Sequence, residues 1–371
     1  MPLSKIVANS ITDNTITTDQ IADTSVHGRR NLIINGAMQV SQRGTSFATM
    51  GNGDSQYTLD RFKWQESGSP TLEMTVTQDS SSPNEMGNSK SLKVEVTTAQ
   101  SSLGSGDRVR IEQYIEAQNC QSIAKGTSAA KALSASFWVK SSKTGTYIVE
   151  LQENDNDRIN SQSYSISSAN TWEHKTLTFP ADTTGAINND TGNGISFRMY
   201  LCAGTDYTSG SLNTSWVGVS GNNTGAAVGQ VNLADTVNAT WYITGVQLEV
   251  GDKATPFEHR SPGEELALCQ RYYVEYRNSR FINGYKRQDA QTAWKVKFPV
   301  PMRATPAVTL DDGGSFTNFQ SVYTATQSSP VIYEPGAELS EIVLTVNSTY
   351  SGTHEVIPSW ESQEVIFDAE L

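Results

Sequence analysis

The 371-residue sequence lacks long hydrophobic runs and has no local cluster of basic residues. Its apolar stretches, such as 32–34, cover only a few residues, whereas a helix that crosses a bilayer needs about 20. The formal net charge is -12, from 39 acidic and 27 basic residues. Because an acidic surface repels nucleic-acid phosphates and anionic lipids, we expect neither nucleic acid nor a membrane as a partner.

Cysteine is also scarce. Cys120, Cys202 and Cys269 lie far apart and form no Cys-x-x-Cys pair. An odd number of widely spaced cysteines fits reduced thiols better than a disulfide framework or a zinc site. The first five residues lead into polar sequence, so we expect no cleaved secretory signal and a protein that folds in a cytosol.

Uncharged polar residues and glycine are abundant instead. Charged residues make up 18% of the chain and hydrophobic residues 36%, and there are 28 glycines. This composition is typical of short strands joined by Ser, Thr, Asn and Gly turns. At roughly 100 to 200 residues per domain, the length predicts two or three folded units. We therefore expect an all-β protein with several units.

A five-residue repeat occupies residues 1–30. An aliphatic side chain recurs at every fifth position, namely at Ile6, Ile11, Ile16, Ile21 and Val26. This spacing matches neither an amphipathic helix nor a strand. One aliphatic residue per repeat cannot bury enough apolar surface within one chain to offset the loss of conformational entropy. We predict that the repeat oligomerises; the alternative is a disordered polar tail.

Residues 31–257 show the period of β-strands. Apolar and polar residues alternate at 92–96, 133–139 and 195–201, and Gly/Asn/Ser stretches separate such runs. The pattern predicts an antiparallel β-sandwich with one solvated face per sheet. In the last run, 241–250, the alternation changes register at Gly245, which predicts a β-bulge.

A helix-start pattern follows the sandwich. The Ser261 side chain can cap the N-terminus of a helix, and Pro262 fits the first helical position. Glu264 can then complete a capping box. We predict a short helix within a linker at 258–276. Beyond it, a C-terminal β-rich domain is predicted over 277–371 from strand-like runs at 294–300, 307–310, 342–346 and 365–367.

Trp138 is the first candidate ligand-binding residue. Its neighbours Phe137 and Val139 point to the opposite face of their strand, so Trp138 lies on the polar face. An exposed tryptophan can stack on a sugar ring, pack under a loop or contact another subunit, and the sequence does not decide among these. Tyr207 and Trp216, in a region rich in Gly, Ser and Thr, are the second candidates.

Catalytic patterns are missing from the sequence. The four histidines are scattered without a metal-binding spacing, and we assign structural roles to His174 and His259. A carboxylate cluster could form either the acid pair of a glycanase or a calcium site; it comprises Glu150, Glu153, Asp155 and Asp157. Because Asx residues are common in turns, we expect no catalytic or metal site and no cofactor, with a structural calcium near Asp155 and Asp157 as the alternative.

Two segments bracket the predicted sandwich. Residues 31–38 read Asn-Leu-Ile-Ile-Asn-Gly-Ala-Met, with Gln-Arg-Gly at 42–44 and Leu-Asp-Arg-Phe at 59–62. Residues 241–250 read Trp-Tyr-Ile-Thr-Gly-Val-Gln-Leu-Glu-Val and continue through 254–260 and 264–273. These segments resemble tail fibre and virion appendage proteins of marine bacteriophages. The bracketed module is also similar to the jelly rolls of carbohydrate-binding modules.

The resemblance implies a structural protein of a virion that is not an enzyme. It implies a homotrimer, assembled in the host cytoplasm, that binds other tail or capsid proteins through residues 1–30. The jelly roll would then face outward and contact a host cell-surface glycan or receptor. One alternative is a capsid decoration or tail adaptor protein with only virion partners, and another is a polysaccharide depolymerase. The structural calcium of the carbohydrate-binding modules has no matching carboxylate here, because Thr244-Gly245 occupies that place.

Overall fold

The computed structural model describes most of the chain from residue 30 to residue 371. The positions outside the description are 1–29, 52, 69, 88, 220–223, 289–290, 311–314, 318–321, 325–330, 334–340 and 348–355. The predicted oligomerisation residues therefore lie outside the described part; they are Ile6, Ile11, Ile16, Ile21 and Val26.

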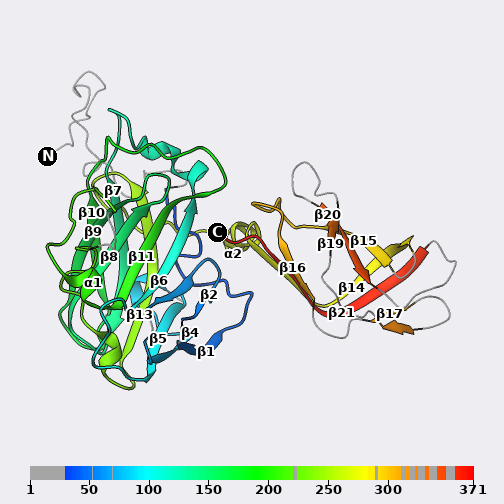
Figure 1. Ribbon diagram of the computed structural model, residues 1–371, viewed down its shortest axis with the longest axis horizontal. Helices are drawn as coiled ribbons and strands as arrows, with labels where there is room; N and C mark the ends of the chain where they lie inside the picture. The colour runs from blue at the N-terminus through cyan, green and yellow to red at the C-terminus, as the bar shows by residue number, and fades with distance from the viewer. Residues whose placement is uncertain are drawn as a thin grey trace, which may run out of the picture.

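Two antiparallel sheets form a sandwich in the described part of 30–257 (Figure 1). The six-stranded sheet has the order β1 (Ser46–Gly51), β4 (Glu73–Asp79), β5 (Ser91–Thr98), β13 (Thr240–Val250), β7 (Leu133–Ser141) and β10 (Glu173–Phe179). The seven-stranded sheet has the order β12 (Val217–Gly218), β9 (Arg158–Ile166), β8 (Gly145–Glu153), β11 (Asn193–Ala203), β6 (Arg108–Glu116), β3 (Lys63–Ser67) and β2 (Ser55–Tyr57). The predicted all-β jelly-roll sandwich is confirmed.

The period-two pattern explains how the sandwich is filled. On β7, Phe137 and Val139 have no exposed surface and belong to the core between the sheets, as do Trp241 and Ile243 on β13. Burial of such side chains contributes roughly 1.5 to 3 kcal/mol each. The pairing of β13 with β7 shifts between Thr244 and Gln247, so the predicted bulge is present.

Short helices connect several strands. They are η4 (Asn84–Met86), η5 (Ala117–Ile123), α1 (Thr205–Thr208) and η6 (Leu233–Asp235). All three cysteines are free and buried, as predicted. Burial raises the pKa of the Cys120 and Cys202 thiols to about 12, so both stay protonated and unreactive at neutral pH.

The predicted helix also forms, as α2 (Pro262–Gln270). The Ser261 hydroxyl oxygen accepts a hydrogen bond of 3.3 Å from the Glu264 backbone N–H. Within the described residues, no helix is long and apolar enough to cross a membrane.

A third antiparallel sheet follows α2 and extends away from the sandwich (Figure 1). Its main order is β18 (Val322–Thr324), β17 (Ser315–Thr317), β21 (Val356–Asp368), β14 (Tyr273–Gln288), β15 (Gln291–Lys297), β20 (Glu341–Asn347) and β19 (Val331–Tyr333), and β16 (Ala307–Leu310) also pairs with β21. The long β14–β21 pair starts beside the sandwich, where Tyr273 lies opposite Asp368. The predicted C-terminal β-rich part of the fold is confirmed.

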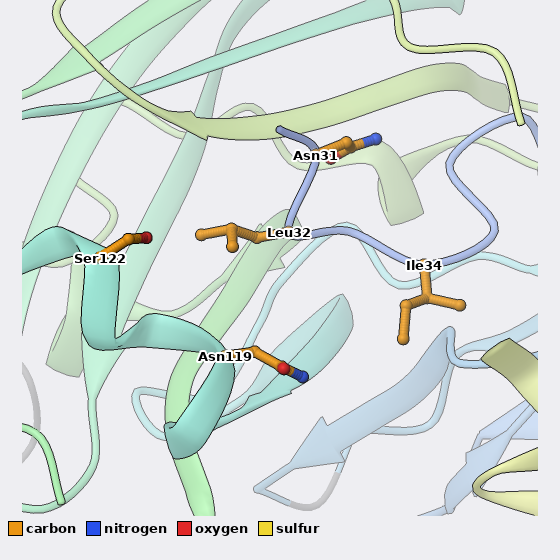
Figure 2. A pocket seen from close by; sticks show the side chains of 5 residues that line it. All are labelled: Asn31, Leu32, Ile34, Asn119 and Ser122. Atoms are coloured by element: carbon orange, nitrogen blue, oxygen red, sulfur yellow. The ribbon is translucent and has the colours of Figure 1, made fainter. Parts of the chain in front are cut away.

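The Asn-Leu-Ile-Ile-Asn motif closes the sandwich. The Asn31 side chain donates to the Val246 carbonyl at 3.0 Å and accepts from the Leu248 N–H at 3.0 Å, which joins the motif to β13. Figure 2 shows a small cavity of about 170 Å³ between this segment and η5, lined by Asn31, Leu32, Ile34, Asn119 and Ser122. Asn31 thus has a structural role, because its side chain makes hydrogen bonds to the backbone of β13 that a neighbouring strand would otherwise make.

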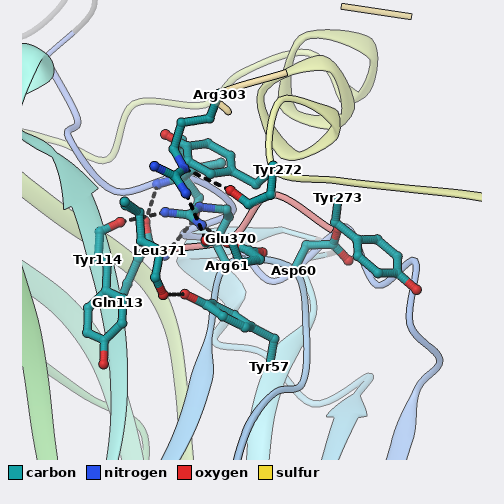
Figure 3. Close-up of polar contacts among 12 residues, drawn as sticks. Tyr57, Asp60, Arg61, Gln113, Tyr114, Tyr272, Tyr273, Arg303, Glu370 and Leu371 are labelled. Atoms are coloured by element: carbon teal, nitrogen blue, oxygen red, sulfur yellow. Dashed lines mark hydrogen bonds and ion pairs between the residues drawn. The ribbon is translucent and has the colours of Figure 1, made fainter. Parts of the chain in front are cut away.

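Buried ion pairs join the sandwich to the residues that follow α2 (Figure 3). The junction cluster consists of Arg61 and Glu116 from the sandwich and Arg271, Tyr272 and Glu370 from beyond it. Arg61 forms an ion pair with Glu370, and their side chains are 1% and 5% exposed. Glu116, fully buried, accepts hydrogen bonds from the Arg271 Nε at 2.8 Å and the Tyr272 hydroxyl at 2.5 Å. Tyr272 therefore packs at the junction, where it is 1% exposed.

The junction should weaken in acid through Glu116. Burial alone would raise the pKa of Glu116, but hydrogen bonds from Arg271 and Tyr272 outweigh it and lower the pKa below the ordinary value. A depressed pKa adds stability that is fully present above the unfolded pKa, about 4.3, and is lost as the pH falls through the folded pKa. Urea unfolding at several pH values should show this loss below about pH 4.3, and Glu116→Gln should reduce it. An equal pH dependence in the variant would contradict the assignment.

Candidate functional site

Trp138 lies on the outer face of the six-stranded sheet. Its strand β7 places it opposite His174 of β10 and Thr244 of β13, so the three side chains share one face. Trp138 is half-buried, and His174 is exposed. Their ring centroids are 5.0 Å apart with an interplanar angle of 50°. The indole is therefore held in place by a neighbour while part of its surface remains open.

A groove of about 470 Å³ opens beside this indole. We call it the Trp138 groove; its lining residues are Glu85, Met86, Ser136, Trp138, His174, Gly245, Pro256, Phe257 and His259. They come from η4, β7, β10, the bulge of β13 and the segment after β13. Phe257 and His259 contact each other edge to face, with ring centroids 5.0 Å apart. The groove thus combines aromatic rings with hydroxyl, imidazole and carboxylate groups.

The bulge glycine shapes the floor of the groove. Gly245 has a φ of +62°, a left-handed conformation in which glycine is favoured. A Cβ at this position would lie 2.9 Å from the Met86 sulfur and 3.3 Å from Cδ1 of Trp138. The Thr244 hydroxyl donates to the Lys90 carbonyl at 2.6 Å and fixes the strand beside the bulge. Glycine therefore lets Met86 and Trp138 approach the backbone.

A second row of side chains continues the same face. Lys140, two residues after Trp138, lies opposite Tyr242 in the β7–β13 register. The Lys140 Nζ is 4.0 Å from the ring centroid of Tyr242 and 5.0 Å from that of Trp172. Burial lowers the pKa of both Lys140 and His174 below their ordinary values. The face that carries Trp138 thus also carries a cation in contact with two aromatic rings.

Part of the face that the sequence predicts to be solvated is covered. Ser134 and Ser136 are only 1% and 3% exposed. The chain returns over β7 after β13, and the Ser134 hydroxyl donates to the Lys253 carbonyl at 3.0 Å. The predicted polar face is therefore open around Trp138 and closed at the start of the strand.

The structure does not bring Tyr207 or Trp216 into the groove. Tyr207 is only 9% exposed and packs in a separate cluster, with the Arg108 guanidinium 4.5 Å from its ring centroid. The Trp216 Nε1 donates to the Pro180 carbonyl at 2.8 Å, and the Lys125 Nζ lies 4.8 Å from the indole. Both rings contact protein neighbours, so the structure gives no support to the prediction that Tyr207 and Trp216 stack on a ligand.

The carboxylates Glu150 and Glu153 are fully buried and paired. Glu150 accepts from the Arg198 guanidinium at 2.9 Å, and Glu153 lies 3.5 Å from the Lys125 Nζ. Carboxylates engaged in buried ion pairs are not free to act as the acid pair of a glycanase.

The two acids of the predicted calcium alternative lie in the turn after β8. Both carboxylate oxygens of Asp155 accept from Asn188, at 2.9 and 2.8 Å, while Asp157 accepts from Gln152 at 3.4 Å. In the part of the chain that the structure describes, no group of three or more His, Cys, Asp or Glu could hold a metal ion. The calcium near Asp155 and Asp157 stays a prediction.

Sequence reasoning missed most of the groove. His174 and His259, assigned structural roles, both line it, and Phe257 and Met86 were not singled out. Two features of the sequence could have indicated the groove. An aromatic pair, Phe257 and His259, follows the last strand of the sandwich, and the bulge glycine Gly245 comes directly after Thr244, which lies opposite Trp138. Neither feature points to a site until the pairing of β7 with β13 is known.

No protein-family model matches the chain, and no curated protein matches it. Among solved structures, the enzymatically active domain of tailspike protein 4 of bacteriophage CBA120 aligns at 13% identity and a TM-score of 0.31, over 59% of this chain and only 21% of that protein. A family 11 carbohydrate-binding module of Clostridium thermocellum aligns at 10% identity and a TM-score of 0.27, covering 57% and 96% of the two chains. A xylan-binding domain of Paenibacillus barcinonensis aligns at 10% identity and 0.27, covering 62% and 100%.

Proposed function

We propose that this protein is a structural component of a phage fibre or tail appendage whose sandwich binds a host-surface glycan in the Trp138 groove. The observation that supports glycan binding is the half-buried, partly open indole of Trp138 in a groove with polar groups around it. Sugars present C–H faces that pack on aromatic rings, and their hydroxyls need hydrogen-bonding groups nearby. The virion role rests on the resemblance of residues 31–38 and 241–273 to fibre proteins.

The composition of the groove favours a sugar over a purely apolar ligand. The polar groups of His174, His259 and Glu85 can donate to or accept from hydroxyl groups. Trp138 and Phe257 offer ring surface. Its volume of about 470 Å³ lies within the usual range of about 300 to 1,000 Å³ for ligand pockets. The groove is therefore suited to a few units of a chain that extends beyond it.

We propose binding without hydrolysis. Glycoside hydrolysis uses two carboxylates on either side of the scissile bond. Of the described residues that line the groove, Glu85 is the one carboxylate. Incubation of the purified protein with the glycans that it binds should release no reducing sugar.

A glycan array with the purified full-length protein tests the function directly. We expect binding to a restricted set of glycans and to host cells, with competition between the two. Retention on virion proteins together with no binding to any glycan or to host cells would instead favour the adaptor alternative.

The resemblance further leads us to propose a homotrimer held by residues 1–30. Each aliphatic residue of the five-residue repeat would then pack against partner chains. Light scattering of the full-length protein should give three times the chain mass, and removal of residues 1–30 should give a folded monomer that no longer attaches to virions. A stable full-length monomer would contradict the proposal.

A further inference from the structure

Lys140 is a cation fixed two residues from Trp138 on the same face of β7, and it is not itself one of the residues that line the Trp138 groove. It is half-buried, its Nζ donates to the Ser81 hydroxyl at 2.8 Å, and the rings of Tyr242 and Trp172 flank it. Cation–π contacts of this kind attract the ammonium to the ring faces and hold it in one place. Lys140 is thus oriented before any ligand arrives.

Among the residues that the structure describes, Lys140 has no direct counter-ion. Other lysines on this sheet are paired, since Lys93 lies 2.5 Å from Glu95 and Lys175 lies 2.5 Å from Glu173. For Lys140, by contrast, no carboxylate among the described residues lies within ion-pair distance. An ammonium has three donors and Ser81 takes one, so donors remain for a ligand.

Asp79 is the carboxylate whose charge acts on Lys140. Its charge acts to raise the pKa of Lys140, although burial, the larger effect, lowers it. The Asp79 carboxylate accepts from the Ser81 N–H at 2.7 Å, which ties it to its own loop. It therefore orients the loop that contacts Lys140 and leaves the ammonium without a salt bridge.

The spacing along β7 links this cation to the groove. Trp138 and Lys140 are two residues apart on the same face, a separation of about 7 Å along a strand. One sugar ring on Trp138 therefore places a charged substituent of that unit, or of its neighbour, within reach of Lys140. An acidic protein with a net charge of -12 repels polyanions elsewhere, so attraction would be confined to such a position.

We propose, resting on the proposed glycan-binding function, that the ligand of the Trp138 groove is an anionic polysaccharide. Its ring stacks on Trp138, and its carboxylate or sulfate group pairs with the ammonium of Lys140. Carboxylated and sulfated sugars share this chemistry, and binding measurements distinguish them.

The test uses the full-length protein and three oligosaccharide probes of equal length: a polyuronate, a sulfated galactan and a neutral glucan. We expect at least one anionic probe to bind ten-fold or more tightly than the glucan, and that preference to shrink as salt is added. Lys140→Gln should weaken the anionic probe about five- to thirty-fold and leave the glucan unchanged. Lys140→Arg should retain most of the affinity, because it keeps the charge.

Lys131→Gln is the matched control, because Lys131 is exposed and the net charge changes equally. It should leave the affinity for every probe unchanged. Equal binding of the glucan and the anionic probes, unaffected by Lys140→Gln, would overturn the anionic ligand and leave glycan binding intact. No binding of any glycan, on the array or among the probes, would overturn both. Thermal unfolding of each variant confirms that the compared proteins are folded.

Discussion

Replacing Arg61 with alanine is expected to destabilise the protein by about 3 to 5 kcal/mol, the largest effect of any single substitution proposed here. Arg61 is 1% exposed and forms an ion pair with Glu370, which lies 309 residues further along the chain. Its Nη2 also donates to the Tyr114 carbonyl at 2.5 Å, and its guanidinium lies 3.4 Å from the ring centroid of Tyr272. The variant removes all three contacts and leaves the buried Glu370 carboxylate with Arg43, 3.3 Å away, as its remaining ion-pair partner among the described residues.

The physical reason is the loss of one partner from a buried ion-pair cluster together with the packing of a fully buried side chain. A buried carboxylate that loses one of its two cations keeps the cost of its lost hydration with less attraction to offset it. Urea unfolding, followed by fluorescence, measures the change in the free energy of unfolding. Because Arg61 and Glu370 belong to different parts of the fold, the variant should also expose the amides near Ala369, whose N–H bonds to the Tyr272 carbonyl at 2.7 Å.

Two further variants keep this expectation falsifiable. Lys175→Ala removes the cation of an ion pair with Glu173 on the surface, and it should cost at most about 1 kcal/mol. The double replacement of Arg61 by Met and Glu370 by Leu removes both charges and leaves Arg43 with Asp368 as its partner. It should recover part of the lost stability. If Arg61→Ala cost no more than Lys175→Ala, the pair would not join the two parts of the fold.

Replacing Trp138 with alanine is expected to weaken glycan binding by about 1 to 3 kcal/mol, by analogy with the stacking of nucleic-acid bases on aromatic side chains. This corresponds to roughly a five- to one-hundred-fold rise in Kd. The reason is the loss of the aromatic surface that the groove presents beside His174 and Phe257. Isothermal titration with a glycan identified on the array measures the effect.

Trp216→Ala provides the matched control for Trp138→Ala. Both indoles are half-buried, but Trp216 donates to the Pro180 carbonyl and lies outside the groove. We expect this variant to lose stability and keep its glycan affinity. Trp138→Ala should do the reverse, because its indole borders open space. A large loss of thermal stability with unchanged affinity in Trp138→Ala would show that Trp138 packs and does not bind.

The sequence by itself determined the features that depend on neighbouring residues. Alternation at 133–139 predicted β7 and the side of the sheet on which Trp138 lies, and the break at Gly245 predicted the bulge. The pattern from Ser261 to Glu264 predicted the start of α2. These predictions held because strand period, bulge glycines and helix caps act over a few residues.

Only the tertiary structure decided which distant residues meet. The groove joins Met86, Trp138, His174 and Phe257 because β7 pairs with both β10 and β13, and strand order is not encoded in the period of any one strand. The burial of Tyr207 could not be predicted either, because a tyrosine in a short helix such as α1 is exposed or covered according to what packs on it. Such contacts depend on the summed packing of many segments, which local patterns leave undetermined.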